Sequence, residues 1–159
     1  MKRFLPIVIA LVVSTIGLTA QEKPKLVVNA FTVAQGIELP YDMKLLQTQL
    51  VAELKVELKE YSVISEPPSP PEGTVYALNG VITGWRPGNA AKRMFVGMGS
   101  GREASDIEFH IADSSGKKVL ERKETIRTNF YSQGAGSSGT LAHPIALKVA
   151  DRIKEAKLK

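Results

Sequence analysis

A run of alternating glycines behind basic residues is the part of the sequence with the clearest binding potential. The segment KRMFVGMGSGRE places three glycines at alternate positions after two basic residues and an apolar triplet. Alternating glycines allow unusual backbone dihedral angles and the close approach of another chain or ligand. Residues 73–102 contain no Asp or Glu. This predicts either a local positive patch, which can attract phosphates, anionic lipid or an acidic partner, or a solvated surface that merely lacks acidic residues. The candidate binding site consists of Arg86, Lys92, Arg93, Phe95, Gly97, Met98, Gly99, Gly101 and Arg102.

The glycine pattern does not predict a nucleotide site. Residues 99–104, GSGREA, match G-x-G-x-x-A, but the dinucleotide fingerprint needs a strand before it and a helix after it. Here an alternating strand pattern follows. No glycine in the segment precedes Lys-Ser or Lys-Thr, so the phosphate loop of P-loop proteins is missing as well. The basic excess is modest, and we expect no nucleic-acid partner.

A second candidate site lies on one face of a predicted strand. In SDIEFHIAD the polar and apolar residues alternate, which is the period of a half-buried strand. The apolar face consists of Ile107, Phe109 and Ile111; the polar face consists of Asp106, Glu108 and His110. With one more ligand these three polar residues could bind a metal ion and support metal-dependent catalysis. A solvent-facing polar strand explains the same pattern, and we favour it, so no metal or cofactor is expected.

Other catalytic patterns are missing from the sequence. There are no cysteines, which excludes thiol nucleophiles, thiolate metal sites and disulfides. No G-x-S-x-G turn is present. His143 precedes Pro144 at the start of a predicted helix, where we expect a structural role. We therefore predict that the protein is not an enzyme.

The N-terminus has the pattern of a secretory signal peptide. Lys2 and Arg3 precede an apolar run, and small residues follow up to Ala20. The apolar run is shorter than the roughly 20 residues that a spanning helix needs, which favours cleavage after Ala20 over an uncleaved anchor. Residues 1–20 are thus predicted to be the signal peptide and residues 21–159 a single domain, periplasmic or secreted. The formal net charge of +5 falls to about +3 when Lys2 and Arg3 leave with the signal peptide.

The remaining sequence predicts an α+β domain. A Val-rich run over Lys25–Val33 predicts a strand buried on both faces. Leucines recur at three- and four-residue steps over Met43–Glu60, which predicts an amphipathic helix with Asp42 as its N-cap. Further strands are predicted over Tyr61–Ser65 and Thr74–Trp85, where Gly80 and Gly84 indicate a bulge or a close backbone contact.

The second half predicts a hairpin and a final helix. DSSGKK has turn chemistry, with Gly116 available for positive φ. The strand after this turn is heavily charged, which is typical of a sheet edge. Ile145, Val149 and Ile153 recur at steps of four, which predicts the last helix. The order strand-helix-strand-strand-strand-strand-helix predicts a two-layer α+β domain: a mixed, mostly antiparallel sheet with both helices on one face.

The string from Asn79 to Leu120 resembles the bacterial domain-of-unknown-function family 4410. The matching elements are Gly80, Gly88-Asn89, Arg93, the glycines at 97, 99 and 101, and the Asp113-x-x-Gly116 turn. The resemblance implies an exported cell-envelope protein; many members look like lipoproteins, but this chain has no cysteine to carry a lipid.

Three functions are consistent with these residues. The first is a non-enzymatic envelope domain that binds or assembles with a protein partner through the basic glycine-rich segment, with some contact to the membrane surface. The second is a binding module for an anionic small molecule or lipid headgroup, which would use Arg86, Lys92, Arg93, Arg102 and glycine amides. The third is a metal-dependent enzyme that uses Asp106, Glu108 and His110.

Overall fold

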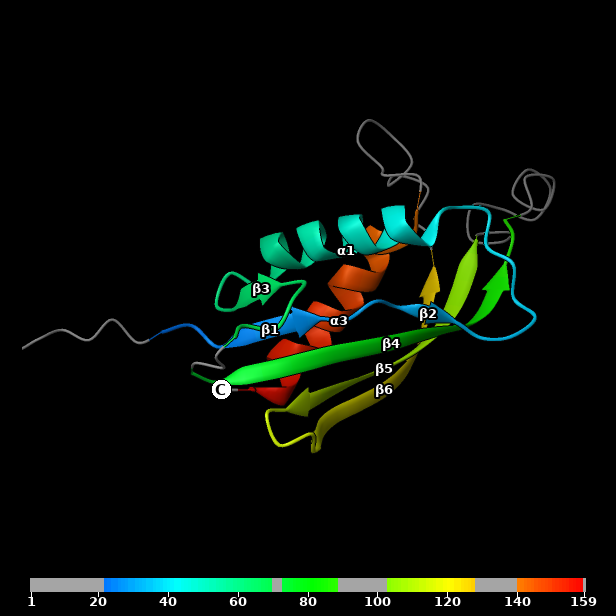
Figure 1. Ribbon diagram of the computed structural model, residues 1–159. Helices are drawn as coiled ribbons and strands as arrows, with labels where there is room; N and C mark the ends of the chain where they lie inside the picture. Colours follow the sequence, from blue (N-terminus) through cyan, green and yellow to red (C-terminus); the bar gives the residue numbers. More distant parts are fainter. Residues whose placement is uncertain (1–21, 70–72, 89–102, 128–139, 159) are drawn as a thin grey trace, which may run out of the picture.

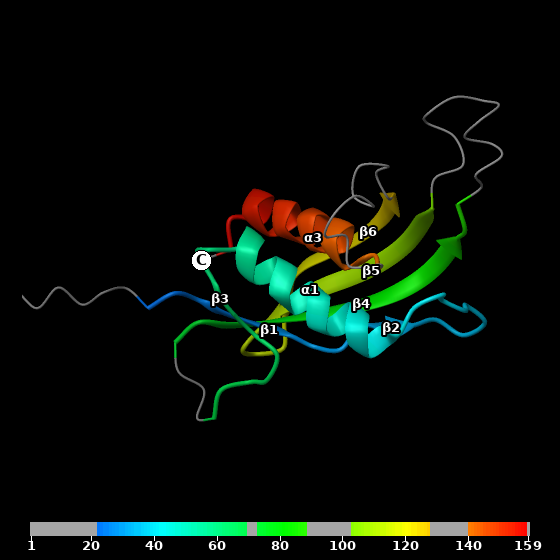
Figure 2. The same cartoon turned by 90° about the horizontal axis from the view of Figure 1, so that it is seen from above.

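The protein is a two-layer arrangement of one mixed sheet and two helices (Figures 1 and 2). A computed structural model describes residues 22–69, 73–88, 103–127 and 140–158. Its elements in chain order are β1 (Lys25–Val28), β2 (Thr32–Val33), α1 (Met43–Glu57), β3 (Ser62–Ile64), β4 (Val75–Arg86), β5 (Ala104–Asp113), β6 (Lys118–Arg127) and α3 (Ala142–Ala156). Both helices lie on the same face of the sheet (Figure 2), so the predicted fold class is confirmed.

The sheet has the strand order β3-β1-β4-β5-β6, and β2 pairs with β4 beyond the end of β1. Strands β1, β2 and β3 make the parallel pairs, whereas β4, β5 and β6 form an antiparallel meander. Helix α1 connects β1 and β2 to the parallel strand β3, as the crossover prediction required. The charged strand β6 is at the border of the sheet, where its composition predicted it.

The strand predicted over Lys25–Val33 is broken into two pieces. Val28 pairs with Leu78 and Thr32 pairs with Val81, so the intervening segment has one more residue than the part of β4 that it faces. The extra residue turns Phe31 into the core, where its ring lies over Gly80. A Cβ atom at Gly80 would come within 2.2 Å of this ring, so the absence of a side chain is a packing requirement.

A side chain of α1 satisfies the backbone at this break. Gln47 donates from Nε2 to the carbonyl oxygens of Val28 (3.2 Å) and Asn29 (3.1 Å). Its Oε1 accepts from the Phe31 amide at 3.1 Å. The broken strand therefore keeps its hydrogen bonds through the helix. As predicted, Asp42 caps this helix by accepting from the Lys44 amide at 2.6 Å.

The core lies between the helices and the inner sheet face. Leu46, Leu50 and Leu54 of α1 are fully buried, as are Ile145 and Val149 of α3. The start of α3 is tied to α1 by two polar contacts, from Thr140 Oγ1 to Gln49 and between His143 Nδ1 and Glu53 (2.9 Å). His143 thus contributes to the contact between the two helices, and its structural role stays a prediction. No helix of the described residues has the length and apolar content needed to cross a membrane.

Candidate functional site

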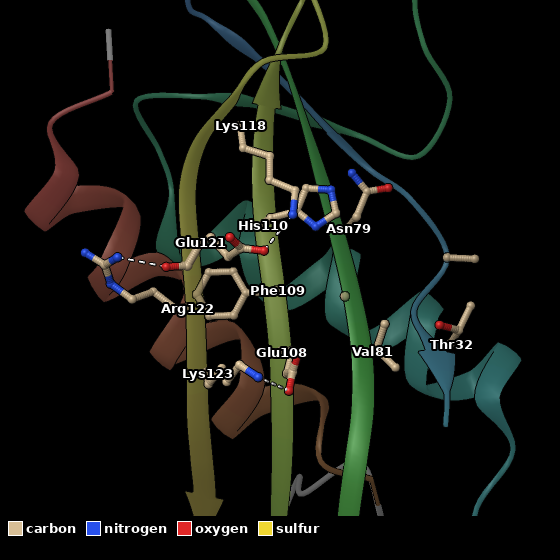
Figure 3. Close-up of a pocket in the computed structure, with 12 residues that line it drawn as sticks. Thr32, Asn79, Val81, Glu108, Phe109, His110, Lys118, Glu121, Arg122 and Lys123 are labelled. Atoms are coloured by element: carbon tan, nitrogen blue, oxygen red, sulfur yellow. Dashed lines mark hydrogen bonds and ion pairs between the residues drawn. The ribbon is translucent and has the colours of Figure 1, made fainter. Parts of the chain in front are cut away.

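The sheet face away from the helices carries rows of polar side chains. As predicted, Ile107, Phe109 and Ile111 are buried while the residues between them face outward. The strand register places Asn79, His110 and Glu121 side by side across β4, β5 and β6 (Figure 3). Asn29 Nδ2 donates to Asn79 Oδ1 at 2.9 Å, which extends this row toward β1. The row thus crosses four neighbouring chain segments on one face.

On β6, the polar residues at the ends of these rows form ion pairs. Lys118 Nζ donates to Glu121 at 2.6 Å, and this bond is the main cause that lowers the pKa of the Glu121 carboxyl. In the next row, Lys123 Nζ donates to the Glu108 carboxylate at 2.7 Å, and this hydrogen bond is the main cause that raises the pKa of Lys123 (Figure 3). Opposite charges alternate, so the face has little net charge.

A shallow hollow of about 340 Å³ lies over these rows, from Thr32 and Asn79 on one side to Lys118 and Lys123 on the other. His110 lies on its floor between Asn79 and Glu121. The hollow offers hydrogen-bond donors and acceptors.

The three residues considered for a metal site do not converge. Asp106, Glu108 and His110 follow one strand face at two-residue steps, which separates neighbouring Cα atoms by about 6–7 Å. Asp106 is held by Thr125 and Arg86, and Glu108 by Lys123. Among the described residues no group of three or more His, Asp or Glu side chains is placed to hold a metal ion. The geometry therefore gives the metal-site hypothesis no support.

Arg86 is the one predicted binding residue that the described part of the chain contains. Its two terminal nitrogens donate to the two carboxylate oxygens of Asp106 at 2.9 and 3.0 Å. Thr125 Oγ1 also donates to Asp106, at 2.7 Å, and the bonds from Thr125 and then Arg86 lower the pKa of this carboxyl. Gly84 makes room for the pair, because a Cβ atom there would lie 2.9 Å from Asp106 Oδ2. The register shift between Ile82 and Gly84 confirms the predicted bulge.

The other predicted binding residues lie outside the described residues: Lys92, Arg93, Phe95, Gly97, Met98, Gly99, Gly101 and Arg102. The described strands nevertheless fix the place from which this segment leaves the sheet. Strands β4 and β5 pair as far as Arg86 and Ala104, so the segment connects the two strands of one hairpin.

A polar cluster that the sequence did not predict lies at the base of this hairpin. Trp85 Nε1 donates to Glu103 Oε1 at 2.9 Å. The buried hydroxyl of Tyr41 has no hydrogen-bond partner among the described residues. Burial and then the charge of Glu103 raise the pKa of Tyr41. Trp85 and Arg86 thus secure the end of β4 by side-chain bonds to residues at the start of β5.

Three connections leave the sheet at this end. Ala104 pairs with Arg86 on one side and with Arg127 on the other, so the ends of β4 and β6 flank the start of β5. The connection from β2 to α1 also lies here, because β2 pairs with β4 at Val81 and Ile82 and Tyr41 is close to Glu103. Figures 1 and 2 show this end opposite the C-terminus.

Together, the fold and these side chains define a small α+β domain with helices on one sheet face, ion-paired polar rows on the other, and connections gathered at one end. The chain belongs to the family described as Domain of unknown function (DUF4410), which matches residues 34–130. The resemblance noted in the glycine-rich region is thereby confirmed.

Solved structures of similar fold come from several proteins. A crystal structure described as that of an uncharacterized protein is 18% identical, with a TM-score of 0.54 over 83% of this chain and 91% of its own. The PelC dodecamer from Paraburkholderia phytofirmans is 17% identical, with a TM-score of 0.51 over 80% of this chain and 87% of its own. Protein XCC0632 from Xanthomonas campestris, of family DUF330, is 11% identical, with a TM-score of 0.52 over 86% and 87%. At these identities the likeness shows the fold alone. No curated protein matches the sequence.

Proposed function

We propose that this chain is an exported, non-enzymatic domain of the cell envelope that binds or assembles with a protein partner through the connection between β4 and β5. The observation that carries this proposal is the gathering of three connections at one end of the sheet. Binding residues are commonly found on loops that a rigid scaffold positions. Here the scaffold is the meander, and side-chain bonds at Trp85 and Arg86 secure the base of the connection.

The composition of the connection supports protein binding. It contains an apolar group beside basic residues and glycines, as the sequence KRMFVGMGSGR shows. Methionine and arginine are enriched at protein interfaces, where methionine adapts its shape to the partner. The pairing of Arg86 with Asp106 neutralises one of the four basic residues of an anion site, which favours a protein partner over a small anion. The similar PelC structure is a dodecamer, so assembly with further copies is one form that this binding can take.

A site-specific crosslinking experiment tests the proposal. The full chain is produced with a photo-crosslinking amino acid at Met98, irradiated in intact cells, and recovered from the envelope fraction. We expect one dominant crosslinked protein, because Met98 lies within the proposed contact segment. The matched control places the crosslinker at Leu45, which is 46% exposed on α1, and should give none.

The double variant Arg93→Glu with Phe95→Asp should abolish the Met98 crosslink. A crosslink that persists in this variant, or no crosslink at Met98, would overturn the proposal. Mass spectrometry of the recovered protein tests export separately: cleavage after Ala20 leaves Gln21 as the first residue.

A further inference from the structure

Within the described part of the chain, strand β6 forms a border of the sheet. Its only strand neighbour among the described residues is β5, and the one described helix that it contacts closely is α3, which covers its inner face. Figure 1 shows β6 as the outermost strand, with no described element beyond it. Ten residues long, it has no strand on its outer side among the described residues, and adding a strand to such an edge is a known way in which sheets bind extended peptides.

A groove follows the last residues of this border. It has a volume of about 360 Å³ and lies between the end of β6 and the first turns of α3. Its apolar part comes from Ile126, Pro144 and Leu147. Leu147 is one of few large apolar side chains exposed among the described residues, with 37% of its surface accessible. The groove is therefore placed to accept an apolar side chain from a strand that pairs with β6.

The charges at the groove favour an acidic occupant. Arg127 and Lys148 line it, and neither has a carboxylate partner within the described ranges. One turn further along α3, Arg152 is in contrast bound by both Glu124 and Glu155. Asp151 is the only acidic residue among those that line the groove. The charges of β6 itself are mostly balanced within the chain, through Lys118 with Glu121 and Lys123 with Glu108.

We propose that β6 and this groove bind an extended segment of a partner protein, which adds to the sheet as a further strand. The segment places an apolar side chain against Leu147 and Pro144, and acidic side chains next to it meet Arg127 and Lys148. Main-chain hydrogen bonds to β6 supply affinity, and the groove and its two cations supply selectivity. This inference rests on the proposed function as a protein-binding domain, but it assigns a different surface.

Defined peptides test this binding mode. The probe is a small panel of fluorescent nine-residue peptides in which valine and threonine alternate around a central aspartate-apolar-glutamate triplet, with leucine, isoleucine or phenylalanine as the apolar residue. Binding to the protein purified from cells that express the full chain is measured by fluorescence anisotropy. We expect saturable binding of at least one acidic peptide, and binding about tenfold weaker for its lysine counterpart.

Two modified versions of the bound peptide test strand addition directly. In one, alternate amide nitrogens facing one side are methylated; in the other, the remaining amides are methylated. Since only one side of an added strand bonds to β6, one version should lose binding and the other should keep it.

Protein variants locate the site. Leu147→Asp should weaken binding about tenfold or more. Leu45→Asp, at a leucine of the other helix that is somewhat more exposed, should leave binding unchanged. Arg127→Glu with Lys148→Glu should reverse the preference from the acidic to the lysine peptide. Thermal unfolding of each variant confirms that it is folded.

The inference is overturned if no acidic peptide of the panel binds, if both methylated versions behave alike, or if Leu147→Asp binds as the unchanged protein does. A crosslink at Met98 without peptide binding would leave the proposed function intact and remove only this surface. Peptide binding without that crosslink would remove the proposed role of the β4–β5 connection and leave the β6 surface intact.

Discussion

Asp106 shows how one residue links the three long strands. From β5 it accepts hydrogen bonds from Arg86 on β4 and Thr125 on β6. Its carboxylate fixes the ends of these strands at the same place where the glycine-rich segment leaves the sheet. The side chains of Arg86 and Asp106 are 59% and 35% exposed, so solvent screening keeps the energy of this pair modest.

Asp106→Asn should therefore lower stability in a pH-dependent way. The folded-state pKa lies below the ordinary value of 3.8, so the stabilisation is complete above the unfolded-state pKa and is lost as the pH falls through the folded-state value. We expect the variant to be about 0.5–1 kcal/mol less stable near neutral pH, and the difference to shrink below about pH 4. Urea unfolding between pH 7 and pH 2.5 measures it.

Asp151→Asn is the control for this experiment. It removes the same charge from an exposed helix position without touching the pair, and should show little difference at any pH. A constant difference between the unchanged protein and Asp106→Asn down to pH 2.5 would contradict the assigned cause.

At the scale of elements, α1 both covers the sheet and completes it. Its buried leucines pack against the core, and its Gln47 amide replaces the backbone bonds that the break between β1 and β2 leaves open. The helix and the broken strand therefore depend on each other. Loss of either partner would leave part-buried polar groups unsatisfied, which costs about 1–3 kcal/mol.

We expect Gln47→Leu to destabilise the protein by about 1–3 kcal/mol, because the Phe31 amide and the two carbonyl oxygens lose their partner. Urea unfolding gives the change in free energy. Thr48→Leu on the same helix is the control, since Thr48 is exposed and, among the described residues, its hydroxyl bonds only to the Lys44 carbonyl of its own helix. Equal stability of Gln47→Leu and the unchanged protein would show that water can replace Gln47 as the hydrogen-bond partner of these backbone groups.

The sequence predicted elements wherever a local period defined them. The alternation around Phe109 predicts a strand with one buried face, and the leucine steps around Leu50 predict a helix with one buried face. The structure contains both, as β5 and α1. The break after Val28 was not predictable, because it depends on Phe31 meeting Gly80 across a long stretch of chain. The Arg86–Asp106 pair was missed for the same reason: the strand register that joins them is a property of the sheet.

At the scale of the whole molecule, one core joins every large element. The buried cluster contains residues of both helices and of all the long strands. Contacts between α1 and α3 and between neighbouring strands leave no separable part among the described elements. A domain of this kind should unfold in a single cooperative step.

The single tryptophan provides the test of this cooperativity. Trp85 lies at the end of the β4–β5 hairpin, bonded to Glu103, so its fluorescence reports on the end from which the binding segment departs. Far-ultraviolet circular dichroism reports on the whole fold. We expect the two urea transitions to coincide. An earlier fluorescence transition would show that the hairpin end opens independently of the core.

The position of β1 has a consequence for how the fold is reached. This strand lies between β3 and β4, and both neighbours come later in the chain. The β5–β6 hairpin, in contrast, closes over a short turn at Asp113–Gly116. Closing a long loop costs more entropy than closing a short one. The β5–β6 hairpin can therefore form early, whereas β1 pairs with β3 only across the long loop that contains α1. In a chain made from its N-terminus, β1 is thus synthesised well before the two strands that enclose it, and its apolar residues stay available to chaperones until β3 and β4 have followed.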